Sequence, residues 1–431
     1  MSNISGVVIN KGKIGANALA NNDAISGLIM EAPAASGLAL DTIAVVRNMK
    51  EVEALGIDAD FDTNNFVNCF RHISEFFRMA GEGVKLYIML VAQDTTAVTL
   101  LTDTVPGSND AKAKSFLINA DGEIRQLGIC TNPTVAPITL NGFNDDTFNA
   151  IPLAQALHDF AYAQHMPCNV LLEGRDYSGV AATSQDLRNI TGVNATKVSV
   201  VIGQDYDYAA ALPLNDGALP TPNTVYLRKF ADVGTALGTV SAAEINQNIG
   251  DNEAFNLTDT QLKVWETPGL SNNATIKSQF NDLQMLEDKG YIFGITYAGL
   301  EGVRWNNDHT CVPIIVDAQG NINEHTIAYG RTADKAVRLL RAAYLPKVKT
   351  KQPVDPVTGL LPPGVVKYFD GIGDTVFGNM VSDTEITAGQ VSTDPNSDLL
   401  VAKSLDISYR IVPYGNVGEI IGTINLKTSQ N

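Results

Sequence analysis

The sequence predicts an α/β protein, α+β overall, with several domains and a β-hairpin near its C-terminus. Apolar segments and amphipathic helical stretches alternate over residues 25–300, an order typical of βαβ units with a parallel sheet. The closing segments alternate apolar and polar residues, which is typical of half-buried strands. The length of 431 residues allows two to four domains at about 150 residues each.

The clearest βαβ unit lies near the N-terminus. Apolar segments at 25–30 and 42–46 are expected strands, and 84–92 is a third. Between the last two, residues 64–79 are an expected helix, because aromatic and aliphatic residues recur there at i, i+4, i+7 and i+11. They are Phe66, Phe70, Ile73 and Phe77.

Both chain ends are expected to pair with something else. Residues 1–24 look like an arm whose only strand contains Val7, Val8 and Ile9, and a lone strand does not stay folded alone. At the other end, alternating segments on either side of a turn at 414–417 predict a terminal hairpin over 405–427.

These features suggest four parts. They are an arm (1–24), a first α/β part of the body (25–100), a middle or outer α/β domain (101–275) and a C-terminal domain (276–431).

Composition excludes several classes of protein. Charged residues make up 18%, below the usual value of about 25%, so a disordered chain is excluded. The net charge of −17 excludes a general nucleic-acid binder. No apolar run reaches the roughly 18 residues that span a membrane, and the N-terminus lacks the pattern of a signal peptide. We therefore expect a cytoplasmic protein with no membrane insertion.

No motif for catalysis, cofactor binding or metal binding is present. Phosphate-binding loops, HExxH and the GxSxG elbow are absent from the sequence. The four cysteines have apolar neighbours and are expected to be buried thiols. His309 follows Asp308 in a polar stretch and is the one place where a catalytic or metal cluster is conceivable. We expect no enzyme, no cofactor and no metal.

One basic helix stands out in this acidic chain. Residues 331–349 are helical, and Arg331, Lys335, Arg338 and Arg341 fall within an arc of about 120°. This arc is either a solvated helix face or a docking surface for an acidic partner.

Together these segments resemble the sheath protein of contractile phage tails and related contractile injection systems. The resemblance lies in Ile25–Ile29 after a short arm, in the unit Thr42–Gly56, and in the aromatic helix that leads into Val84–Ile88. It continues in the closing segments Ile407–Pro413 and Ile420–Ile424. The likeness is greatest to the branch in phages and prophages of Bacteroidetes-like bacteria.

The resemblance implies a sheath-like architecture and a structural role. A sheath subunit polymerises as stacked hexameric rings around an inner tube, in a metastable lattice that contracts and drives the tube through a target envelope. Terminal arms exchange strands between subunits, which here implies Val7, Val8 and Ile9 at one end and Ile420, Ile421 and Ile424 at the other. The basic helix would face the tube.

The implied partners are the chain itself, the inner tail tube protein, and baseplate and tail-terminator proteins. The implied location is a virion tail that is assembled in the bacterial host cytoplasm. Two alternatives stay open. One is another lattice-forming virion or structural protein, and the other is an α/β enzyme with a site near His309.

Overall fold

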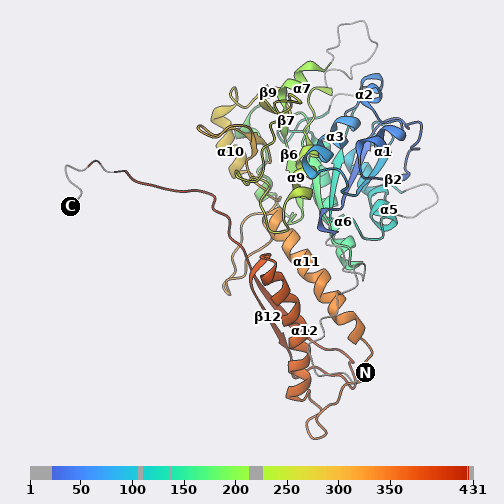
Figure 1. Ribbon diagram of the computed structural model, residues 1–431, viewed down its shortest axis with the longest axis vertical. Coiled ribbons are helices and arrows are strands. Elements are labelled where there is room, and N and C mark those ends of the chain that lie inside the picture. Colours follow the sequence, from blue (N-terminus) through green and yellow to red (C-terminus); the bar gives the residue numbers. More distant parts are fainter. Residues whose placement is uncertain (1–21, 105–109, 135–136, 213–226, 425, 427–431) are drawn as a thin grey trace, which may run out of the picture.

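The computed structural model describes residues 22–104, 110–134, 137–212, 227–424 and 426. An α/β body contains the residues up to about 325, and an elongated C-terminal domain projects from one end of it (Figure 1). The segment after the last strand extends away from both.

A six-stranded sheet forms the centre of the body, in the order β2-β3-β1-β4-β5-β6. All neighbours are parallel except β2, which runs antiparallel to β3. The strands are β1 (Ser26–Glu31), β2 (Ile43–Val46), β3 (Leu86–Val91), β4 (Gln126–Cys130), β5 (Asn169–Glu173) and β6 (Val198–Val201). β1, β3, β4, β5 and β6 are buried along their whole length, which explains their nearly continuous apolar sequences.

Helices cover both faces of the sheet, and alternate side chains of each strand enter two cores. In β1, Ile29 packs in the core beneath α4–α6, whereas Leu28 and Met30 pack beneath α1–α3 and α9. The first set is α4 (Ala97–Thr102), α5 (Lys112–Asn119) and α6 (Asp145–Ala163). The second set is α1 (Met49–Ala54), α2 (Ala59–Asn65), α3 (Cys69–Ala80) and α9 (Val233–Ala242).

Smaller elements complete the body beside β6. They are β7 (Gly203–Asp205), α7 (Tyr206–Ala211), β8 (Pro268–Leu270), β9 (Ala274–Thr275), α10 (Leu283–Asp288), β10 (Gly294–Ile295) and β11 (Arg304–Trp305). Trp265 and Trp305 are fully buried there with their ring centroids 5.3 Å apart.

A long helix, α11 (Ile327–Tyr344), joins the body to the C-terminal domain. Its second half packs with α12 (Pro363–Ser382) and with an antiparallel ribbon of β12 (Ile386–Thr393) and β13 (Ile407–Pro413). Ala336, Leu340, Phe377 and Met380 form the small core between them.

The fold-class prediction of an α/β protein with a βαβ body is confirmed, with two differences in detail. The helix expected at 64–79 begins only at Cys69, because Phe66 adopts a left-handed conformation (φ 54°) that ends α2. The sheet also combines strands from residues 25–100 with strands from residues 101–275, two segments predicted to be separate parts.

The predicted terminal hairpin over 405–427 is wrong. β13 pairs with β12, in a register that runs from Ile386↔Pro413 to Thr393↔Ile407. The described residues after Pro413 form no strand. Alternation of apolar and polar residues predicts an extended segment but does not identify the strand with which that segment pairs. In this structure β12 takes the place beside β13 that was predicted for the C-terminal segment.

Candidate assembly interface

The C-terminal segment exposes a row of large aliphatic side chains. Ile420, Ile421 and Ile424 are 89%, 83% and 93% exposed, and no described residue of this chain covers them. Soluble proteins seldom leave such a row uncovered unless it meets a partner. The segment is rich in β-branched residues, as strands are. Among the described residues no strand pairs with it. The matching residues of the N-terminal arm, Val7, Val8 and Ile9, lie outside the described residues.

The ribbon of β12 and β13 offers unpaired strand edges. Within the described part of the chain it has only these two strands, so each keeps one edge of free backbone groups. One face of the ribbon is held by α12, where Phe377 lies so close to Gly389 that a Cβ there would sit 2.5 Å from the ring. A two-stranded ribbon is marginal in water unless a helix supports it or further strands join it.

The predicted basic face of α11 is not a free surface. Arg331 and Lys335 are only 3% and 6% exposed, and Arg338 is partly buried. Arg341 alone of the four predicted residues is exposed. A helical wheel places these cations on one arc correctly, but it does not show that the body and the chain before β1 cover that arc.

Carboxylates of the same chain meet these cations. Asp23, in the short 3-10 turn Asn22–Ala24 that precedes β1, pairs with Lys335 (Nζ–Oδ2 2.8 Å) and with Arg338. Lys335 also pairs with Glu385, the residue before β12. The Arg331 guanidinium donates to the carbonyls of Ala243 and Glu244 at the end of α9. We name Asp23, Arg331, Lys335, Arg338 and Glu385 the arm-root junction.

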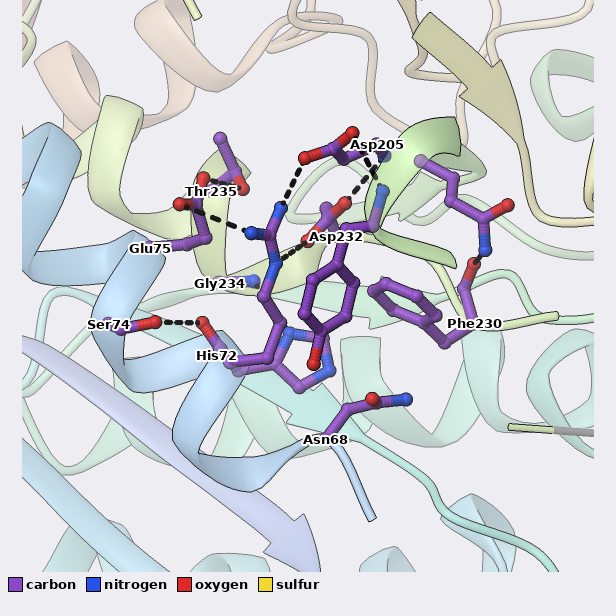
Figure 2. Close-up of polar contacts among 12 residues, drawn as sticks. Asn68, His72, Ser74, Glu75, Asp205, Phe230, Asp232, Gly234 and Thr235 are labelled. Carbon is purple, nitrogen blue, oxygen red and sulfur yellow. Dashed lines mark hydrogen bonds and ion pairs between the residues drawn. The ribbon is translucent and has the colours of Figure 1, made fainter. Parts of the chain in front are cut away.

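A second charge cluster lies deep in the body (Figure 2). Arg71 on α3 pairs with Asp205 (3.1 Å), Asp232 (3.2 Å) and Glu75 (3.5 Å), and Figure 2 shows these three carboxylates converging from different elements. Its guanidinium also lies 4.3 Å from the ring centre of Tyr208. Arg78 also pairs with Glu75 (2.6 Å), so two cations face three carboxylates, and burial raises the pKa of Asp232 to about 6.

One group of possible metal ligands lies beside this cluster, but it does not suit a cation. The ligand atoms of His72, Cys130 and Glu173 lie within 4.8 Å of one another. Burial lowers the pKa of His72 to about 3, so its ring is neutral. Because the Gly234 N–H donates to Nδ1 (3.3 Å), the ring proton is on Nε2, and neither nitrogen has a free lone pair for a metal.

The surroundings of His309 also have structural roles. His309 is 3% exposed and its Nε2 lies 2.8 Å from Glu287, while Arg188 contacts the same ring. Asp308 accepts the Ala328 N–H at the start of α11 (2.9 Å) and an amide hydrogen of Asn248. These contacts fasten α11 to the body and do not present a nucleophile to the imidazole.

Arg71, Asp23 and Glu385 were not among the site residues predicted from the sequence. Arg71 gave no signal, because it lies one residue from the apolar stripe of α3 and looks like a solvated charge. Asp23 gave a weak one, since it is the only acidic residue in the first 24 positions. All four cysteines are buried and free, as predicted.

Comparison with solved structures defines the class of fold. The chain matches a chain of the anti-feeding prophage baseplate, from a six-fold symmetrised structure, with a TM-score of 0.57 and 14% identity over 99% of this chain and 100% of that one. It matches the anti-feeding prophage helical sheath in its contracted state with a TM-score of 0.53 and 13% identity over 100% of both chains. The fold is therefore sheath-like, as the resemblance implied.

Family models assign the chain more closely. The N-terminal domain model of DUF2586 matches residues 4–309, and the C-terminal domain model of the same family matches 325–431. This chain belongs to the DUF2586 family. No curated protein matches it. No helix in the described part of the chain is both long and apolar enough to cross a membrane.

Proposed function

We propose that this protein is the structural sheath subunit of a contractile tail or injection apparatus and not an enzyme. It polymerises as stacked hexameric rings around an inner tube, and contraction of the lattice drives the tube through a target envelope. The observation that carries the proposal is the uncovered aliphatic row at Ile420–Ile424, in a chain whose sheath-like fold extends over its full length.

Strand exchange follows from that row. The C-terminal segment of one subunit adds to a free edge of the β12–β13 ribbon in a neighbour, and the strand at Val7–Ile9 adds to another edge. Main-chain hydrogen bonds supply the affinity, and alternate side chains supply the register. Each ribbon then becomes a wider sheet, which is stable where a two-stranded ribbon is marginal.

Contraction needs no active site. The extended lattice is metastable, and the contracted lattice buries more surface per subunit. Subunits move mainly as rigid bodies about their interfaces, and the exchanged strands pass the change from ring to ring. The apparatus belongs to a virion tail that assembles in the host cytoplasm, with baseplate and tail-terminator proteins at its ends. The Bacteroidetes-like lineage stays a prediction.

Three of the four predicted cations are engaged within the chain, and this changes where the tube contact can lie. Arg331, Lys335 and Arg338 are engaged in the arm-root junction and are not available to a tube. Arg341 is exposed, and Lys349 and Lys351 follow it on the surface. An open groove of about 560 Å³ lies between α11 and α12, lined by Ala343, Lys367 and Tyr368 among others. We place the tube contact at this end of α11, where exposed ion pairs worth roughly 0–1 kcal/mol each would break during contraction.

Charged substitutions in the C-terminal segment test strand exchange. Ile420→Asp and Ile424→Asp place charges on one face of the donated strand, since residues i and i+4 share a face. We expect each variant to keep the thermal midpoint of the wild type but to sediment as a monomer at concentrations where the wild type polymerises. Val357→Asp is the matched control, because Val357 is 91% exposed in a turn of the same domain. Polymerisation of the tail variants like the control would contradict strand exchange.

A further inference from the structure

The arm-root junction connects three parts of the molecule at one face of α11. Arg331, Lys335 and Arg338 follow one another at i, i+4 and i+7, so their side chains share that face. Arg331 contacts the body, Lys335 contacts the C-terminal domain through Glu385, and both Lys335 and Arg338 contact Asp23. Asp23 is where the N-terminal arm enters the described structure.

A second contact closes the same joint. The Asn246 side chain, just after α9, donates to the carbonyl of Thr384 (2.9 Å). Thr384 precedes Glu385, which leads directly into β12. The start of the ribbon is therefore attached to the body at Thr384 and, through Glu385, to Lys335, which also holds Asp23.

The arm-root junction has more cations than carboxylates, so loss of Asp23 would increase its imbalance of charge. Three cations face two carboxylates, and Asp23 and Glu385 are each 8% exposed. Among the described residues, the Arg331 guanidinium donates hydrogen bonds to carbonyl oxygens. If Asp23 leaves, Arg338 has no carboxylate within ion-pair distance among the described residues, and Lys335 keeps only Glu385. Uncompensated buried charge is strongly unfavourable, so α11 would then favour an arrangement in which water reaches Lys335 and Arg338.

We propose that the arm-root junction is a latch: displacement of the N-terminal arm withdraws Asp23 from Lys335 and Arg338 and so frees the C-terminal domain to change its orientation to the body. The proposal rests on the proposed function in one respect: the force that moves the arm comes from a neighbouring subunit that holds the donated strand. A pull on the arm of one subunit would thereby be converted into a rotation of its own ribbon, the element on which the next strands are held.

If the arm and the ribbon are coupled through the junction, a change on either side must affect the other side, and the experiment measures both effects. Amide hydrogen exchange is followed by mass spectrometry on the full-length protein at a concentration where it is monomeric. Asp23→Asn removes the arm-side charge and keeps the side-chain shape. Lys335→Met removes the charge on α11 and keeps most of the apolar stem.

We expect each variant to loosen the opposite side of the junction. Asp23→Asn should raise exchange at Thr384–Ala388 by about tenfold or more, as loss of a buried ion pair implies. Lys335→Met should raise exchange at Ser26, the first residue of β1. Glu82→Gln and Lys50→Met are the charge-matched controls, since both side chains are exposed, and they should leave both regions unchanged.

Two results would overturn the latch. In one, each variant changes exchange only beside its own substitution. In the other, β3 in the centre of the sheet loses protection as much as Thr384–Ala388 does, which would mean general destabilisation. Because the measurement is made on monomers, it stands or fails independently of whether the chain forms tubes.

Discussion

At the scale of single residues, this protein buries charged side chains and uses them to join elements. Arg71 draws α3, α7 and α9 together through Asp205 and Asp232, and Lys335 joins the arm root to the ribbon. Neither role could be predicted from the sequence. A charged residue on an amphipathic helix is usually solvated, and its burial depends on which distant segment covers it.

The buried carboxylates predict how stability depends on pH. Burial raises the pKa of Asp62 to about 7 and those of Asp232 and Asp308 to about 6, from ordinary values of 3.8. At each of these three carboxyl groups the folded state binds more protons than the unfolded state between about pH 4 and the folded pKa. Their contribution to the free energy of unfolding should therefore rise as pH falls through this range, and it is lost as pH rises through the folded pKa values.

Asp232→Asn isolates one of these groups. We expect a change from pH 8 to pH 5.5 to raise the thermal midpoint of the wild type more, or lower it less, than that of the variant, because the variant lacks one carboxyl group that takes up a proton on folding in this range. Differential scanning calorimetry at both values measures this, with the exposed Asp60→Asn as control. An identical pH dependence in the variant and the wild type would count against the buried-charge account.

At the scale of elements, strands and helices with strong periodicity were predictable and their partners were not. The strands at β1, β2 and β3 follow from continuous apolar runs, and the aromatic helix follows from its spacing. The C-terminal segment shows the limit of this approach: Ile420–Ile424 was predicted to pair with β13, yet β13 pairs with β12. Periodicity fixes the conformation of a segment, whereas pairing depends on the three-dimensional order of elements.

The contact between α3 and α9 gives a test at this scale. A Cβ at Gly234 would lie 2.2 Å from the His72 carbonyl oxygen, so the two helices touch through backbone. Gly234→Ala should therefore lower the free energy of unfolding by about 1–3 kcal/mol.

Gly378→Ala on α12 is the matched control, since nothing lies within 4 Å of its Cβ position. It should raise the free energy of unfolding by about 0.4–1 kcal/mol through the unfolded state. Urea denaturation measures both, and equal effects of the two substitutions would show that the helices do not meet as closely as described.

At the scale of the whole molecule, charge is divided unevenly. Residues 1–324 carry 19 basic and 37 acidic residues, a net charge of −18, whereas residues 325–431 carry 11 and 10. Acidic bodies repel one another, and the nearly neutral C-terminal domain is the part that can approach another copy at low cost. Salt shortens the range of this repulsion to about 10 Å at 0.1 M, so polymers should form at lower protein concentration as salt increases.

Electron microscopy of the purified protein in negative stain, over a concentration series at about 0.05 and 0.5 M salt, tests the central claim that this chain is a sheath subunit. We predict long hollow tubes with a helical repeat above a threshold concentration, and a lower threshold at the higher salt. Uniform small particles at every concentration and both salts would contradict the claim and would return attention to the surroundings of His309.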